Sequence, residues 1–94
     1  MAAKTFMLTY AYVPEMLERR QPHRAAHLAH LEEARTRGML QLAAAFADPV
    51  DGALFVIQAE DAVDIFAWLA NDPYNKAGLI RGATVREINV AVRA

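Results

Sequence analysis

The central segment, residues 39–59, limits the possible folds of this chain more than any other feature. It contains two short apolar runs, Met39 to Phe46 and Ala53 to Ala59. The stretch between them, Ala47 to Gly52, contains aspartate, proline and glycine, which favour tight turns. Apolar runs of strand length joined by such a turn predict a β-hairpin in the middle of the chain.

A strand and a helix are expected before this hairpin. Lys4 to Tyr12 is rich in aromatic and β-forming residues, and Pro14 ends the run. The helix that follows has Pro22 in its first turn and Gly38 directly after its last turn, where these residue types are favourable. The intervening residues, Glu15 to Arg20, are predicted to form a loop or a single helical turn.

A second helix and a last strand are expected after the hairpin. Asp61 can cap a helix from Ala62 to about Asn71, which ends before Pro73 because the residue preceding a proline avoids the helical conformation. Tyr74 to Leu79 is predicted to add one short turn. Thr84 to Val92 alternates apolar and polar residues, as a strand does when one of its faces is buried.

These elements follow the order strand, helix, strand, strand, helix, strand. That order is the βαββαβ pattern of a ferredoxin-like α+β fold, in which two helices cover one face of a four-stranded antiparallel sheet. Residues 1–94 are expected to form one such domain. The last strand carries more apolar residues than a solvated sheet face needs, including Val85, Val90 and Val92. Two sheets are therefore expected to pack face to face in a homodimer, a dimeric α/β barrel.

The composition narrows the classes of ligand. The 94-residue chain has no cysteine, so disulfides, cysteine zinc sites and a thiolate nucleophile are excluded. A net charge of -1 without a basic patch argues against nucleic-acid binding. The segment from Met1 to Tyr12 lacks the features of a signal peptide, and no apolar run approaches the ~20 residues of a membrane span. A cytoplasmic protein that binds a small molecule or another protein is expected.

His27 is the residue that most clearly suggests chemistry. On a helical wheel it shares one arc with Leu31 and Ala34, while Glu32 and Glu33 lie on the opposite side. The ring therefore takes a position that an apolar side chain fills in an ordinary amphipathic helix. Because imidazole titrates near neutral pH, an enclosed histidine is a candidate proton carrier. The alternative is a core histidine held by one hydrogen bond.

Other side chains are candidates for binding a ligand or orienting this histidine. Arg24 lies one helical turn earlier and could hold an anionic group with its planar donors, or pair with a surface carboxylate. Asp72 precedes a proline, where its backbone is restricted and its side chain can be aimed at a fixed target, although turn aspartates are common. Tyr10, Tyr12 and Tyr74 could each offer a phenol to a pocket, or pack in the core.

Histidines also recur at helical spacing, at His23, His27 and His30, which could bring them to one metal ion. The outer two are expected toward the flanks of the helix, and the HExxH pattern of many zinc sites is missing. Solvated flank histidines are therefore expected, without a metal. The sequence also lacks a glycine-rich phosphate loop and nucleotide-binding motifs, so no cofactor is expected.

The second helix carries apolar residues on two sides. One set consists of Val63, Phe66 and Ala70. Ile65 and Trp68 fall on the opposite side of the helical wheel. If the first set faces the sheet, Ile65 and Trp68 are exposed and form a contact surface for a partner. The alternative is a helix that is buried on both sides.

Several groups of residues along the chain form a recognisable set of motifs. They are Arg24-x-x-His27-Leu28-x-x-Leu31 in the first helix, Gly38 after it, Asp48 to Gly52 in the hairpin turn, and Asp72-Pro73-Tyr74 with Ala77-Gly78-Leu79. Together they resemble the YciI-like, or YCII-related, family over nearly the whole chain. The resemblance implies a ferredoxin-like fold, a dimeric α/β barrel and an active site centred on a histidine and an aspartate. Those two residues correspond to His27 and Asp72, and Arg24 corresponds to a basic pocket residue.

The resemblance has one departure and leaves the substrate open. Members of the family often have a Gly-Pro pair at the end of the second strand, where this chain has Ala44-Ala45-Phe46, so a different pocket wall is expected. Most members have no assigned substrate. One relative of this family eliminates chloride from a chlorinated hydroxyquinol.

The expected function is acid/base catalysis on an activated small molecule. If the Asp72 carboxylate reaches one ring nitrogen of His27, it fixes the tautomer and leaves the other nitrogen to accept or donate a proton. Such a pair suits lyase, isomerase or dehalogenase chemistry, for example on a hydroxylated aromatic substrate. The alternatives are a non-catalytic ligand-binding or assembly module and a cofactor-independent monooxygenase of the wider dimeric-barrel group. An open cavity beside His27 favours an enzyme, whereas a filled core favours the module.

Overall fold

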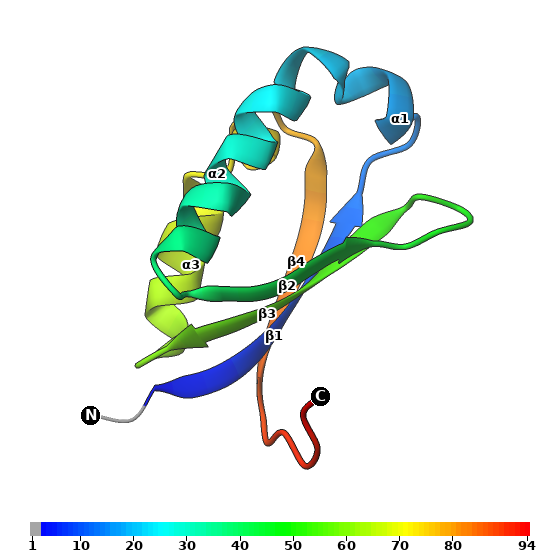
Figure 1. Cartoon of the computed structure of the whole chain (residues 1–94). Helices are drawn as coiled ribbons and strands as arrows, with labels where there is room; N and C mark the ends of the chain where they lie inside the picture. Colours follow the sequence, from blue (N-terminus) through cyan, green and yellow to red (C-terminus); the bar gives the residue numbers. More distant parts are fainter. Residues whose placement is uncertain (1–2) are drawn as a thin grey trace.

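The chain folds in the predicted order of elements (Figure 1). The structure is a computed structural model that describes residues 3–94. Met1 and Ala2, the start of the N-terminal segment considered for a signal peptide, lie outside the described residues. The elements are β1 (Lys4–Tyr12), α1 (Met16–Arg19), a 3₁₀ turn η1 (Gln21–His23), α2 (Arg24–Thr36), β2 (Leu40–Ala45), β3 (Gly52–Ala59), α3 (Ala62–Ala70), α4 (Pro73–Lys76) and β4 (Ile80–Ile88).

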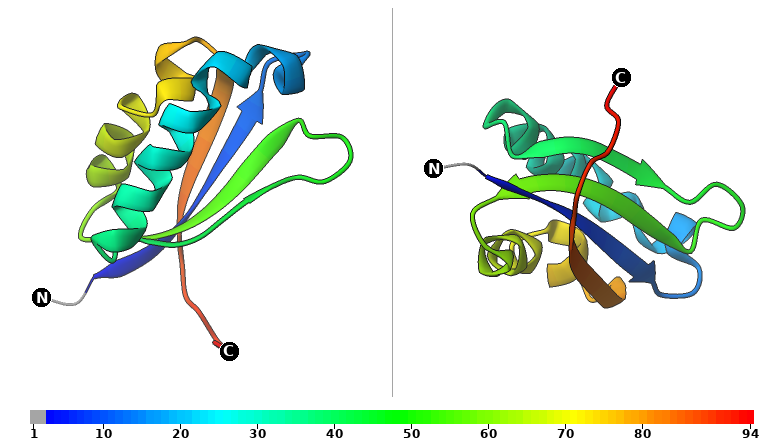
Figure 2. Two further views of the ribbon diagram at one scale, coloured as in Figure 1. Left: turned by 45° about the horizontal axis from the view of Figure 1, so that its top comes forward. Right: turned by 90° about the horizontal axis from the view of Figure 1, so that it is seen from below.

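Within residues 3–94, the strands form one four-stranded sheet in the order β2-β3-β1-β4. All neighbouring strands are antiparallel. The longer helices α2 and α3 lie side by side on one face of the sheet, and no helix of the described residues lies on the opposite face (Figures 1 and 2). This arrangement confirms the predicted ferredoxin-like α+β fold.

The core lies between the sheet and the two long helices. β1 alternates half-buried and buried residues, because successive side chains of a strand point to opposite faces. β3 follows the same pattern and pairs with β1 over its whole length. The largest core side chains that these strands and α3 supply are Phe6, Leu8, Tyr10, Tyr12, Phe55, Ile57, Ile65 and Trp68.

Gly38 ends α2 in the predicted way. Its φ of 79° lies in the left-handed region, which glycine adopts without steric cost. The amide of Gly38 donates to the carbonyl of Arg35, and the amide of Met39 donates to that of Ala34, both at 3.0 Å. This Schellman arrangement satisfies carbonyls that would otherwise lack partners and turns the chain into β2.

The last strand begins and ends earlier than predicted. The alternating pattern predicts a strand from Thr84 to Val92, but β4 spans Ile80–Ile88. The pairing with β1 sets both limits. Ile80 pairs with Tyr12, the last residue of β1, and Ile88 pairs with Thr5, near its start. Val90 and Val92 lie beyond the sheet and are exposed, so neither contributes to a sheet face.

The orientation of α3 corrects one expectation. Ile65 and Trp68 face the sheet, with 0% and 5% of their surface exposed, whereas Val63 and Phe66 are 67% and 50% exposed. The two sets do lie on opposite sides of the helix, but the expected contact surface of exposed Ile65 and Trp68 is wrong. Trp68 is buried because its indole packs edge-on against Phe55, with 5.8 Å between the ring centroids.

No helix within the described residues is both long enough and apolar enough to cross a lipid bilayer.

Candidate active site

Helix α2 directs His27 into the protein, as its helical position predicts. His27 is 5% exposed and Ala34, on the same arc, is fully buried. Glu32 and Glu33 are exposed on the far side. Leu28, next to His27, is 45% exposed, so the histidine sits near the edge of the buried face.

The short helix α4 holds Asp72 in place. Asp72 caps this helix, because its side chain accepts a hydrogen bond of 2.9 Å from the backbone amide of Tyr74. Pro73 occupies the first helical position, where its missing N–H costs nothing. Gly78, with a φ of 74°, ends the helix, and the amide of Leu79 donates back to the Tyr74 carbonyl. The Asp72-Pro73-Tyr74 and Ala77-Gly78-Leu79 motifs are therefore the start and the end of one helical turn.

His27 and Asp72 form a buried hydrogen-bonded pair. Nδ1 of His27 lies 2.8 Å from Oδ1 of Asp72. The hydroxyl of Tyr10 donates to the other carboxylate oxygen, Oδ2, also at 2.8 Å. Asp72 has none of its surface exposed. Its carboxylate therefore finds its partners within the protein, from α2, β1 and α4.

These contacts decide the protonation of the pair. Burial by itself raises the pKa of the Asp72 carboxyl, but the hydrogen bond and charge of the His27 ring, followed by the other donors, hold this pKa below its usual value. An ionised carboxylate can only accept hydrogen bonds, so Nδ1 of His27 carries the proton that they share. Whenever the ring is neutral, its free lone pair is therefore on Nε2.

Two tyrosines support the pair from different sides. The Tyr74 ring stacks on the His27 ring, with 3.7 Å between centroids and 6° between planes. Burial, and then the neighbouring Asp72 carboxylate, raise the pKa of the Tyr10 phenol well above its usual range. Tyr10 therefore remains a hydrogen-bond donor to Asp72. Tyr10 and Tyr74 thus orient the His27–Asp72 pair.

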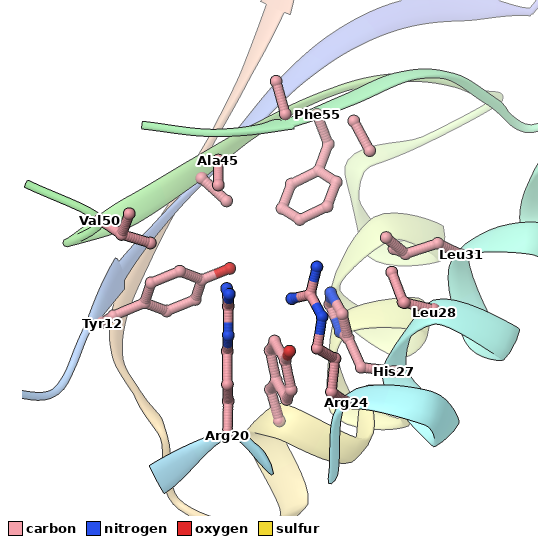
Figure 3. A pocket seen from close by; sticks show the side chains of 13 residues that line it. Tyr12, Arg20, Arg24, His27, Leu28, Leu31, Ala45, Val50 and Phe55 are labelled. Carbon is pink, nitrogen blue, oxygen red and sulfur yellow. The ribbon is translucent and has the colours of Figure 1, made fainter. Parts of the chain in front are cut away.

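A cavity of about 300 Å³ lies beside His27 (Figure 3). This volume is at the lower end of the ~300–1,000 Å³ typical of small-molecule sites. Leu28 and Ala44, which line it, are exposed, so the cavity reaches the surface. The cavity is lined by Tyr12, Arg20, Arg24, His27, Leu28, Leu31, Ala43, Ala44, Ala45, Val50, Ala53, Phe55 and Tyr74.

The predicted ligand-binding residues separate into two groups. Arg24 and Tyr74 line the cavity, whereas Tyr10 is not among its lining residues and lies behind Asp72. Ala44 and Ala45 stand where members of the YciI-like family often have a Gly-Pro pair, and both form part of the cavity wall. The small alanine side chains therefore shape the side of the pocket opposite α2.

Sequence reasoning missed Arg20, which also lines the cavity. Figure 3 shows the guanidinium groups of Arg20 and Arg24 directed into the cavity, with the Tyr12 hydroxyl on the same side. Burial raises the pKa of Tyr12 to about 12, and the two arginines oppose this rise. Arg20 lies between α1 and η1, outside the regular helix α2, so the sequence contained no helical spacing that could have identified it.

The flank histidines His23 and His30 lie apart from His27, and the expectation that they are solvated is wrong, since both are half-buried. Nε2 of His30 lies 3.1 Å from the backbone oxygen of Trp68, and its ring stacks on the indole. His23 is half-buried in η1 and is not among the residues that line the cavity. Among the described residues, no group of three or more histidine and carboxylate side chains is placed to hold a metal ion.

Solved structures share this fold. The 5-chloro-2-hydroxyhydroquinone dehydrochlorinase of Burkholderia phenoliruptrix, solved with 2,5-dihydroxybenzoquinone, is 25% identical with a TM-score of 0.79, over 90% of this chain and 93% of that one. A proposed antibiotic biosynthesis monooxygenase of Bacteroides thetaiotaomicron is 13% identical with a TM-score of 0.62, over 97% of this chain and 91% of that one. The Pseudomonas aeruginosa protein PA3566 is 8% identical with a TM-score of 0.61, over 98% of this chain and 97% of that one. The last two likenesses establish the fold alone.

The sequence itself matches one family model. No curated protein is similar enough in sequence to match the chain. The family model of the YCII-related domain matches residues 5–89. This match spans the sheet, the helices and both members of the buried His27–Asp72 pair, and the chain therefore belongs to the YCII-related family.

Proposed function

We propose that this protein is an enzyme that uses His27 as a general acid and base on a small hydroxylated cyclic substrate. The observation that carries the proposal is the buried His27–Asp72 hydrogen bond beside a cavity of about 300 Å³. Asp72 holds one ring nitrogen, so the other is available to a ligand. The similarity to a dehydrochlorinase solved with a dihydroxybenzoquinone supports this class of substrate.

The proposed chemistry is an elimination assisted by proton transfer. Nε2 of His27 removes the proton of a ring hydroxyl, and the imidazolium that forms is stabilised by the Asp72 carboxylate. The ring carbon that carries the leaving group then receives this proton as the ring oxygen becomes a ketone. Nε2, which is free again, accepts the proton of a second ring hydroxyl, and the electrons released expel the leaving group with its bonding pair. The net change is loss of HX, with no oxidant or reductant.

Substitution of His27 by Asn tests this proposal. The amide nitrogen of Asn can replace Nδ1 as a donor to Asp72, but nothing replaces Nε2 at the cavity. With 5-chloro-2-hydroxyhydroquinone as test substrate, chloride release is expected to fall about 10²–10⁴-fold, the usual contribution of acid/base catalysis. The control His23→Asn alters a histidine that does not line the cavity and should keep the wild-type rate.

The competing function is a ligand-binding module without catalysis. In that case the wild-type protein binds hydroxylated quinones but releases no chloride, and His27→Asn changes only the affinity. Wild-type turnover in His27→Asn would also contradict the acid/base role.

We further propose that the protein is a homodimer that buries the helix-free face of the sheet. Leu42, Val56 and Met7 are cross-strand neighbours in β2, β3 and β1 on this face. Leu42 is 49% exposed, and the other two are half-buried. An apolar row across the centre of a sheet is a typical contact between packed sheets.

A further inference from the structure

The cavity contains more positive charge than its surroundings neutralise. Arg20 and Arg24 both line it, and neither belongs to an ion pair found within residues 3–94. Asp72, the carboxylate next to the cavity, already accepts three hydrogen bonds from other groups. The two guanidinium groups therefore remain available to a ligand.

Two buried donors at the same cavity also lack acceptors. Among the described residues, neither Nε of Arg20 nor the hydroxyl of Tyr74 has a hydrogen-bond partner, although both atoms are buried. Tyr74 is 1% exposed. Buried polar groups without partners cost free energy and are rare. Two of the three such atoms among the described residues belong to residues that line this cavity, which indicates a missing acceptor.

We propose that Arg20 and Arg24 bind an oxyanion of the substrate, which makes the substrate an organic anion. The class of substrate rests on the proposed function, since His27 lies in the same cavity. Guanidinium groups suit this task because their planar donors match the oxygens of carboxylates and enolates. Both arginines are half-buried, and partial exclusion of water strengthens their attraction for an anion.

The rest of the cavity indicates how such a substrate is oriented. Phe55, Val50 and Ala45 form an apolar wall that suits the face of a ring. The oxyanion lies at the arginines, the ring lies against this wall, and the reacting atom faces His27. An ionised ring hydroxyl and a carboxylate on the ring both fit this description, because both present a negatively charged oxygen to the arginines.

Matched pairs of probes test the proposal with the wild-type protein. One pair is 2,5-dihydroxybenzoate and its methyl ester, which differ in the carboxylate charge. The other is 2,5-dihydroxybenzoquinone, whose hydroxyls are acidic, and its uncharged dimethyl ether. By calorimetry, the anion of at least one pair is expected to bind roughly tenfold or more tightly than its neutral partner, with a smaller advantage at high salt. The pair that shows the preference identifies the type of oxyanion.

Arg20→Gln is the informative variant, because Gln keeps a polar side chain but removes the charge. Affinity for the preferred anion should fall roughly tenfold, while affinity for its neutral partner stays unchanged. Arg19→Gln is the matched control, since Arg19 is exposed and does not line the cavity. If Arg20→Gln does not fold, the acid and ester affinities of the wild-type protein decide the question.

The outcomes for the anion site and for catalysis are separable. Equal affinity for the charged and neutral members of both pairs overturns the anion site, whether or not the protein is an enzyme. A clear preference for the anion without turnover supports the anion site and contradicts the proposed function. His27→Asn keeps both arginines and should still bind the preferred anion more tightly than its neutral partner, because Arg20 and Arg24 supply the positive charge of the proposed contact.

Discussion

Tyr10 and Tyr74 both approach the His27–Asp72 pair and are almost completely buried, yet their hydroxyl groups have different surroundings. The Tyr10 hydroxyl donates to Asp72 at 2.8 Å. The Tyr74 hydroxyl lacks a partner in the described part of the chain and belongs to a residue that lines the cavity. The first hydroxyl therefore serves folding, and the second is available to a ligand.

The two Tyr→Phe variants should consequently behave in opposite ways. Tyr10→Phe removes a hydrogen bond to a charged group and should lower the free energy of unfolding by about 1.5–3 kcal/mol. Tyr74→Phe removes a hydroxyl without a partner and should leave the stability equal or higher, while it weakens the binding of quinone ligands. Urea unfolding and calorimetry of both variants check this. A loss of stability in Tyr74→Phe similar to that in Tyr10→Phe would show that its hydroxyl does have an internal partner.

Asp72 should make the stability of the fold depend on acid pH. Its pKa is lower in the folded protein than in the unfolded chain. The stabilisation is therefore fully present above the ordinary aspartate pKa of about 3.9 and is lost as the pH falls through the lower folded pKa. The difference in unfolding free energy between wild type and Asp72→Asn should shrink over that range. Urea titrations at neutral and acid pH measure it, and a difference independent of pH would contradict an ionised Asp72.

At the scale of the elements, two glycines allow a direct test of the end of α2. Gly38 has a φ of 79°, whereas Gly82, in β4, has no positive φ, and a Cβ at either position meets open space. Gly38→Ala should cost about 1–2 kcal/mol, the usual cost of the left-handed conformation for a residue with a Cβ. Gly82→Ala has no such strain and should be neutral or slightly stabilising. Equal melting temperatures for the two variants would contradict the role of Gly38 as a helix cap.

The elements also show what the sequence could predict. The strands and long helices follow from local patterns: alternation in β1, turn residues between β2 and β3, and caps at Gly38 and Asp61. The limits of β4 depend on which residues of β1 are available to pair with it. The sequence of β4 alone does not contain this information. The buried face of α3 could not be chosen either, because both sides are apolar and contact with Phe55 decides between them.

The site was predictable to a similar extent. The position of His27 on α2 and the motif around Asp72 indicated both members of the pair, and the structure places them in contact. Tyr10 instead lies behind Asp72, because its place in β1 directs it to the carboxylate and away from the cavity. Arg20 precedes η1 in an irregular segment, so helical periodicity could not assign its direction.

At the scale of the whole molecule, the two faces of the sheet are unequal. The helices cover one face, and the other has an apolar row of Leu42, Val56 and Met7. This row ends at Arg86 of β4, which pairs with Met7. The core of residues 3–94 is small, so covering this face with a second copy, as proposed, would add stability that a monomer lacks.

Val56→Lys tests this dimer, because it places a charge in the middle of the apolar row. We expect wild-type protein to sediment at twice the chain mass of 10.4 kDa and Val56→Lys to sediment as a folded monomer. Val63→Lys is the matched control, since Val63 is 67% exposed on α3, among the helices on the opposite side of the sheet, and this variant should remain dimeric. A monomeric wild type would refute the dimer. Loss of the dimer in Val63→Lys alone would move the interface to α3, where Val63 and Phe66 are exposed.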